Sequence, residues 1–298
     1  MASKEHDFSV GSIPRNIISL ALPMTAAQLI NVLYSVVDRI YLGRLPGHLA
    51  LTGLGLTLPI ISIVMGFANL CGTGGAPLCS IYRGKGEEEE AERIMGNAFT
   101  LLLIFGAAVT GVFLLFRHPL LYLFGASDAT YPYAEAYMTI YLLGTIFVQL
   151  SLGLNNFITT QGFSTTSMLT VVIGAVCNIV LDPIFIFGLD LGVQGAALAT
   201  ILSQAVSAVW VLAFLTGRKS RLKIRRRHLR LDPKVLLPVA AIGVSPFIMQ
   251  STESLVTVVL NVGAQKYGGD LYVASITILQ SVMQVIVMPS HGITTGVQ

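Results

Sequence analysis

Eight long apolar runs restrict what this chain can fold into. About 20 apolar residues are enough for a helix to cross the hydrocarbon core of a bilayer. Only 11% of the residues are charged, whereas an ordinary soluble domain has about 25%. Because a backbone in lipid must satisfy its own hydrogen bonds, the sequence predicts an all-α polytopic membrane protein. The predicted helices are residues 14–43, 49–81, 94–116, 132–160, 165–188, 194–216, 234–262 and 271–297.

The 18 Lys and Arg residues are distributed unevenly between the two ends of these helices. If the N-terminus is cytoplasmic, 14 of them fall in cytoplasmic segments, and only Arg39, Arg44, Arg117 and Lys266 lie near the other side. Cytoplasmic loops of membrane proteins carry the excess of Lys and Arg. We therefore expect a multi-pass protein of the plasma or inner cell membrane, with the N-terminus and residues 217–233 in the cytoplasm.

The densest basic cluster is residues 217–233, between the sixth and seventh predicted helices. Anionic lipid headgroups attract basic segments next to a membrane, so we expect this linker to contact them. A nucleic acid is the alternative partner for such a patch. Nucleic-acid binding requires more assumptions than contact with lipid headgroups does, so we expect no nucleic-acid binding.

The apolar pattern begins again after this linker. Pro23 is followed 51 residues later by Gly74, and Pro246 is followed 50 residues later by Gly296. This indicates an internal repeat, as in transporters built from two similar halves. The last predicted helix is still apolar at Gln298. We therefore predict a fragment with a six-helix lobe at 1–216, a linker at 217–233 and the first two helices of a second lobe at 234–298.

The fifth apolar run contains one carboxylate, Asp182. An ionisable side chain in lipid is costly and normally faces a protein-lined cavity that serves ion or proton movement. Asn178 lies four residues earlier, on the same helix face, and Pro183 has no N–H and leaves a carbonyl near Ile179 free. Such oxygens can bind a hard cation or a proton. Asp-Pro can instead mark a turn where the chain leaves the membrane, although the apolar run continues to Gly188.

Counting residues from the helix ends predicts that four polar side chains lie at one depth. Asp38, Tyr137, Asp182 and Thr200 are each five or six residues from the end opposite the basic linker, or about 8 Å below that face. Two carboxylates at one level repel each other when both are ionised. A proton or a bound Na⁺ relieves this repulsion. Two alternatives remain: Asp38 forms a surface ion pair with Arg39, and Tyr and Thr are common near membrane interfaces.

Five more polar residues within the predicted helices can line a substrate path. Hydrogen bonds between packed helices are the alternative for the amides, and a buried pair with Ser251 or Thr257 is the alternative for the carboxylate. The motifs G-x-x-x-x-G-K-[ST], H-E-x-x-H and G-x-S-x-G do not occur in the sequence, so we expect no enzyme activity. The candidate path residues are Gln28, Asn31, Asn155, Asn156 and Glu253.

Segments 21–43, 177–200 and 287–298 resemble the multidrug and toxic compound extrusion (MATE) family of cation-coupled antiporters. The resemblance implies twelve helices in two six-helix lobes around a V-shaped central cavity. It also implies that Na⁺ or H⁺ drives export. Glu253 is similar to a carboxylate that one branch of the family uses, although the local spacing differs. The family's cation-site positions fall on Asp38, Tyr137, Asn178, Asp182 and Thr200, and the implied Na⁺ ligands are Asp38, Asn178, Asp182 and Thr200.

These observations together predict a secondary active exporter. We expect it to exchange small amphipathic or cationic organic compounds for Na⁺ or H⁺, with no other cofactor. A flippase for lipid-linked oligosaccharides or lipids is the alternative function. Such a flippase needs a basic cavity for pyrophosphate, whereas the charges inside the predicted helices are mostly acidic.

Overall fold

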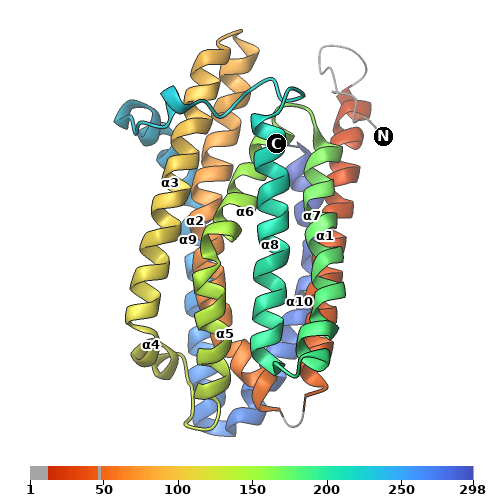
Figure 1. Ribbon diagram of the computed structural model, residues 1–298, viewed down its shortest axis with the longest axis vertical. Coiled ribbons are helices and arrows are strands. Elements are labelled where there is room, and N and C mark those ends of the chain that lie inside the picture. The colour runs from red at the N-terminus through yellow and green to blue at the C-terminus, as the bar shows by residue number, and fades with distance from the viewer. Residues whose placement is uncertain (1–12, 46–47, 298) are drawn as a thin grey trace.

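The computed structural model describes residues 13–45 and 48–297, which form a bundle of long helices lying side by side (Figure 1). The end of the bundle that carries residues 217–233, the basic linker, is called the linker end below. The helices are α1 (Ile13–Gly43), α2 (Leu49–Gly84), α3 (Glu88–Leu115), α4 (Arg117–Leu123), α5 (Tyr131–Leu143), α6 (Thr145–Thr159), α7 (Ser164–Pro183), α8 (Gly192–Thr216), α9 (Pro233–Gly268) and α10 (Asp270–Val297).

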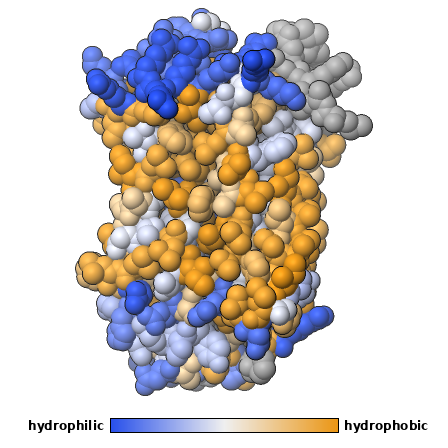
Figure 2. All heavy atoms as spheres, in the orientation of Figure 1, coloured by the Kyte–Doolittle hydropathy of each residue, from blue (hydrophilic) through white to orange (hydrophobic). Residues whose placement is uncertain are grey.

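The all-α membrane fold predicted from the sequence is confirmed. Within the described residues, five helices are long and apolar enough to cross a membrane, or six if the bent pair α5 and α6 is one span. The predicted runs 14–43 and 271–297 are also helices, α1 and α10. A broad apolar band separates hydrophilic surfaces at the two ends of the molecule (Figure 2). This pattern suits a bundle surrounded by hydrocarbon, with both ends in water.

The single helix predicted at 132–160 is wrong. The chain forms α5 and α6 there, and the two meet at Gly144 with a bend of 57°. A Cβ on Gly144 would overlap the side chain of Ile201 on α8. Glycine therefore lets α8 pack closely against the bend. The apolar run does not reveal the break because its hydrophobicity continues on both sides of Gly144.

Helix α2 is the centre of the bundle and packs against α3, α5, α6, α9 and α10. Its glycines allow close contacts. A Cβ on Gly72 would lie 2.7 Å from the carbonyl oxygen of Gly153 on α6, and one on Gly74 would overlap the backbone of α9. Helix α9 has a matching glycine, Gly243, where a Cβ would overlap the carbonyl oxygen of Leu70. Because α9 packs so closely on α2, the predicted second-lobe hairpin is held directly by the first six helices.

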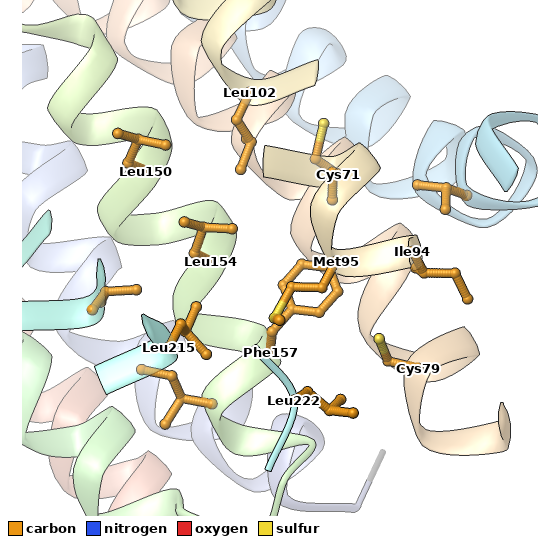
Figure 3. Close-up of a cluster of buried hydrophobic side chains, with 14 of the residues drawn as sticks. Cys71, Cys79, Ile94, Met95, Leu102, Leu150, Leu154, Phe157, Leu215 and Leu222 are labelled. Atoms are coloured by element: carbon orange, nitrogen blue, oxygen red, sulfur yellow. The ribbon is translucent and has the colours of Figure 1, made fainter. Parts of the chain in front are cut away.

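The hydrophobic core at the linker end joins helices to the linker itself (Figure 3). Phe157 of α6 and Met95 of α3 are fully buried at its centre. Leu222 of the basic linker is also fully buried in this cluster. The linker is therefore part of the folded bundle at this point.

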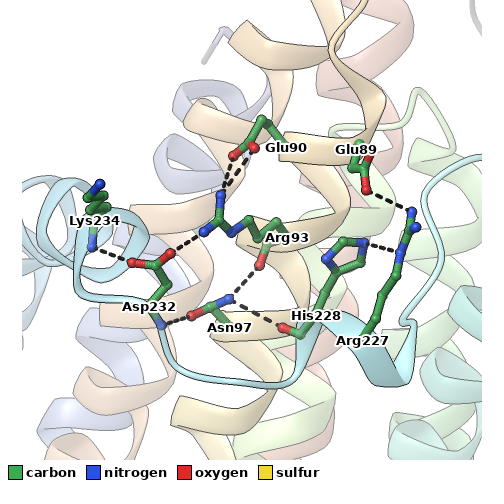
Figure 4. A network of polar contacts seen from close by, with 8 residues as sticks. All are labelled: Glu89, Glu90, Arg93, Asn97, Arg227, His228, Asp232 and Lys234. Carbon is green, nitrogen blue, oxygen red and sulfur yellow. Dashed lines mark hydrogen bonds and ion pairs between the residues drawn. The ribbon is translucent and has the colours of Figure 1, made fainter.

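Polar contacts hold the basic linker against α3 (Figure 4). The side chain of Asn97 donates to the carbonyl oxygen of His228 at 3.3 Å and accepts from the backbone N–H of Asp232 at 2.7 Å. Arg93 forms ion pairs with Asp232 and with Glu90. Asn97 is completely buried, so its amide replaces hydrogen bonds that the linker backbone would otherwise make to water.

Two more buried side chains receive the beginning of the linker. Gln161, just after α6, accepts hydrogen bonds from Ser220 and from the backbone N–H groups of Arg221 and Leu222, at 2.9–3.1 Å. Glu92 of α3 accepts from the backbone of Lys223 at 3.1 Å. The linker thus has a defined path across the bundle. The proposed division into 1–216, 217–233 and 234–298 stays a prediction.

Substituting Gly243 tests how closely α9 approaches α2. We expect Gly243→Ala to lower stability by about 1–3 kcal/mol, because the added methyl group forces the two backbones apart. Thermal unfolding of the purified protein in detergent measures this. Gly263→Ala on the same helix is the matched control, because a Cβ there meets nothing within 4 Å. Alanine also favours a helix over glycine, so equal losses in the two variants would contradict the packing argument.

Candidate cation-binding site

Helix α7 carries the carboxylate that the sequence singled out. Asp182 is completely buried and Asn178 nearly so. The chain does not turn at Asp182 and Pro183, so the alternative of a membrane exit there is wrong. It continues as a π-helical turn over Ile184–Gly188. Such turns often occur at functional sites, and here the missing N–H of Pro183 gives the turn a cause.

Side chains from α5 and α8 meet Asn178 and Asp182. The amide nitrogen of Asn178 donates to Asp182 Oδ1 at 3.2 Å and to Thr200 Oγ1 at 3.5 Å. The buried phenol of Tyr137 lies next to Thr200. The structure therefore places Tyr137, Asp182 and Thr200 close together, as counting residues from the helix ends predicted.

Asp38 of α1 completes the group. It is only 8% exposed and lies close enough to Asp182 for the two carboxylates to interact electrostatically. No ion pair between described residues joins Asp38 to Arg39. Arg39 instead donates a hydrogen bond to Ser281 of α10. The surface location of the proposed pair is therefore wrong, because Asp38 lies in the interior between α1 and α7, where Arg39 still interacts with it electrostatically.

Three oxygens in this group have no hydrogen-bond partner in the protein. They are Asp38 Oδ1, Asn178 Oδ1 and Asp182 Oδ2, and all are buried. A buried polar atom without a partner costs about 1–3 kcal/mol, and a charged one costs more. A proton or a hard cation can offset this cost, because such cations take oxygen ligands. The group therefore has the chemistry of a cation site.

The donor set fits a single positive charge. The described part of the chain contains no cluster of three or more His, Cys, Asp or Glu side chains able to hold a metal ion. Two carboxylates, an amide oxygen and a hydroxyl oxygen instead match a proton or Na⁺. The roles assigned to Asp38, Tyr137, Asn178, Asp182 and Thr200 stay a prediction.

Sequence reasoning missed two tyrosines beside this site. Tyr34 lies within electrostatic range of both Asp38 and Asp182. The ring of Tyr141 stacks on that of Tyr137, with centroids 6.2 Å apart. Each lies one helical turn from a residue already assigned, Tyr34 from Asp38 and Tyr141 from Tyr137. Spacing by four residues could have found both.

Within the described part of the chain, no hydrogen bond joins any two of the five candidate path residues. Asn155 donates to the carbonyl oxygen of Ser167 at 3.3 Å, which is a hydrogen bond between packed helices. Asn156 lies against Gly72, where a Cβ would be 2.5 Å from its amide nitrogen. Gln28 and Asn31 are half-buried on α1. The substrate path stays a prediction for these residues.

Glu253 is not the buried carboxylate considered from the sequence. It is exposed on α9 and accepts a hydrogen bond from Gln250 at 3.3 Å. Thr257 donates a hydrogen bond to the backbone carbonyl oxygen of Glu253 and not to its carboxylate. The buried pair with Ser251 or Thr257 is therefore wrong. The sequence misled because α9 is apolar on most sides, so its exposed face could not be identified from periodicity.

Comparisons with known proteins agree on one family. A family model described as MatE matches residues 23–184. The multidrug export protein MepA of Staphylococcus haemolyticus (strain JCSC1435) is 28% identical over 261 residues, which cover 88% of this chain and 58% of MepA. MepA of Staphylococcus aureus (strain NCTC 8325 / PS 47) is 26% identical with the same coverage. The chain thus spans less than two thirds of the length of these relatives.

Solved structures show the same likeness. The MATE multidrug transporter DinF-BH aligns with a TM-score of 0.93 and 33% identity, over 99% of this chain and 66% of that one. A MATE protein in complex with MaD3S aligns with a TM-score of 0.85 and 27% identity, over 96% of this chain and 64% of that one.

Cation binding is expected to stabilise the fold through Asp182. A ligand that binds only the folded state raises stability by about 2.7 kcal/mol at a hundred times its Kd. Thermal unfolding of the whole protein in detergent, with and without Na⁺ and at two pH values, measures this increment. We expect Asp182→Asn to lose it. Asp190→Asn is the control, because Asp190 is exposed and its positive φ of 53° suits Asn. An equal increment in both variants would contradict the assignment.

Proposed function

This chain belongs to the MatE family, and on that premise we propose that it forms part of a secondary active exporter. The exporter moves small amphipathic, often cationic organic compounds out of the cell. Na⁺ or H⁺ flowing inward drives the movement. The names of its relatives, which are export proteins and transporters, support transport over enzyme activity.

The observation that carries this proposal is the group of buried oxygens without partners on α1 and α7. Two acids held near each other in low dielectric repel when both are ionised. A proton or Na⁺ between Asp38 and Asp182 removes the repulsion and draws α1 toward α7. Its departure reverses the effect. The cation therefore biases the position of α1 relative to the other helices.

Movement of α1 can reach the substrate through α10. Helix α1 packs extensively on α10, and Arg39, next to Asp38, donates a hydrogen bond to Ser281 there. A cation at Asp38 therefore affects α1 directly and α10 through Arg39. These two helices lie on opposite sides of the contact between the first predicted lobe and the hairpin of α9 and α10. If the cation and the substrate favour different arrangements of this contact, each lowers the affinity for the other.

A flippase for lipid-linked oligosaccharides or other lipids remains the alternative function. It would need basic side chains inside the membrane to bind pyrophosphate. The described site instead gathers two carboxylates, and Arg39 beside them is bound to Ser281. No observation favours the flippase.

Removing either acid should uncouple export from the cation gradient. We expect Asp38→Asn and Asp182→Asn each to lower gradient-driven efflux of a fluorescent organic cation by at least about tenfold, because one shared charge site is lost. The measurement uses vesicles with Na⁺ and pH gradients imposed separately, which also identifies the coupling ion. Asp190→Asn should keep full efflux. Unchanged efflux in both site variants would contradict the mechanism.

We also propose that the basic linker lies in the cytoplasm of a cell whose plasma membrane holds the protein, and that it contacts anionic lipids. Two arginines of the linker form ion pairs with α3. Arg225 pairs with Glu92 at 2.8 Å and Arg227 with Glu89 at 3.0 Å. Arg230 is exposed and borders a hollow of about 350 Å³ beside α3. An exposed arginine next to such a hollow can hold a lipid phosphate.

Charge removal tests the lipid contact. We expect Arg226→Gln with Arg230→Gln to reduce the stabilisation that anionic lipid gives the detergent-solubilised protein, at about 1 kcal/mol per lost charge. Both residues are exposed. Arg44→Gln is the control, since Arg44 is exposed at the opposite end. An equal loss from Arg44→Gln would mean that the effect is not specific to the linker.

A further inference from the structure

A series of polar and small side chains leads from the cation site toward the linker end. On α7 these residues precede Asp182 in the sequence at intervals of three or four residues, which keeps them on one helix face. Helices α8 and α6 carry matching series, and the three helices pack on one another. These residues are named the polar file: Asn178, Gly174, Thr170 and Ser167 on α7, Thr200, Ser203, Gln204 and Ser207 on α8, and Ser151, Asn155 and Thr159 on α6.

Hydrogen bonds connect the three series. Ser207 donates to the carbonyl oxygen of Thr170 at 3.1 Å, and Thr159 donates to Ser167 Oγ at 2.9 Å. Gly174 lies beside the contact between Ser207 and Thr170, where a Cβ would be 2.5 Å from Ser207 Oγ. Glycine therefore gives the hydroxyl access to the α7 backbone between Asn178 and Thr170.

The remaining contacts extend the file along α6. Ser151 donates to Gln204 Oε1, close to the level of the cation site. Asn155 donates to the carbonyl oxygen of Ser167 at 3.3 Å. The file ends at the linker end, because α6 terminates at Thr159 and α7 begins at Ser164.

Interhelical packing alone does not account for this arrangement. The hydroxyl oxygen of Ser203 and the amide oxygen Oδ1 of Asn155 are buried and have no hydrogen-bond partner in the protein. Most buried polar atoms in proteins are satisfied, and hydroxyls outside the file can bond to their own helix backbone, as Thr216 does to Leu212. Water molecules that bridge such atoms would satisfy them and make the file continuous.

We propose that the polar file is the route by which the coupling proton leaves Asp182 toward the linker end, which we place in the cytoplasm. This rests on the proposed export function and deepens it by naming H⁺ as the ion. Hydroxyls both donate and accept hydrogen bonds, so with bridging water they relay a proton.

Two features make the route unsuitable for Na⁺. Residues 145–159, 164–181 and 192–216 contain no Asp or Glu, so the file has no negative charge to hold a metal cation on its way. Its side chains also contact one another directly, as Thr159 and Ser167 do, which leaves no room for a hydrated ion at that point. A proton moves between neighbouring hydroxyl groups and water molecules, so it needs neither a negative charge along the route nor room for a hydrated ion.

The test uses Ser203→Ala and Asn155→Leu in the whole protein, reconstituted in vesicles with a pH indicator inside. We expect each variant to slow proton movement coupled to dye export severalfold, and Ser203→Ala to do so with dye affinity unchanged. Ser203→Ala removes an oxygen without a partner, so its melting temperature should be unchanged or higher. Thr216→Val is the control, because Thr216 is an exposed residue of α8 whose hydroxyl bonds only to Leu212 of its own helix.

Outcomes distinguish this proposal from the proposed function. If Asp182→Asn stops coupling but Ser203→Ala and Asn155→Leu keep the full proton rate, the route is wrong and the exporter stands. If Asp182→Asn has no effect either, the exporter mechanism fails as well. Export driven equally well by Na⁺ at constant pH would also overturn the proton route. A lower melting temperature with an unchanged proton rate in Asn155→Leu would show that Asn155 serves packing.

Discussion

The burial of two carboxylates near each other is the constraint on which the rest of this structure depends. Asp38 and Asp182 lie on different helices, and each leaves an oxygen without a partner in the protein. Both oxygens are buried inside the bundle, out of contact with bulk water. In the proposed mechanism, the free energy of the folded state therefore depends on the positive charge that reaches the pair, and the arrangement of α1 and α7 responds to a cation.

The packing around the site fixes α1 less firmly to α2 than several other helices are fixed. Helix α2 is held by glycines against α6 and α9, and the basic linker is bound to α3 and to the end of α6 through Glu92, Asn97 and Gln161. Helix α1 has few contacts with α2 and packs mainly on α7 and α10. In the proposed mechanism, energy released at Asp38 thus acts on a helix that has few contacts with the central one.

Sequence reasoning found the spans and most of the site, because both follow from local rules. Apolar runs locate membrane helices, and counting along helices of alternating direction placed Asp38, Tyr137, Asp182 and Thr200 together. It failed where tertiary contacts decide. The bend at Gly144 depends on Ile201 from another helix, the partner of Arg39 lies 242 residues away, and the exposed position of Glu253 depends on which face of α9 packs on α2. No local pattern contains these contacts.

The proposed ion route and most of the candidate substrate-path residues lie on different helices, with Asn155 and Asn156 of α6 as the exceptions. The polar file lies among α6, α7 and α8, whereas the polar residues of α1 and the exposed Glu253 of α9 lie on other helices. The cation site connects the two sets, since Asp38 belongs to α1 and Asp182 to α7. A proton that left through the file would release α1 without passing the contact between α1 and α10. Separate routes would let the proton leave Asp182 without passing through the substrate path.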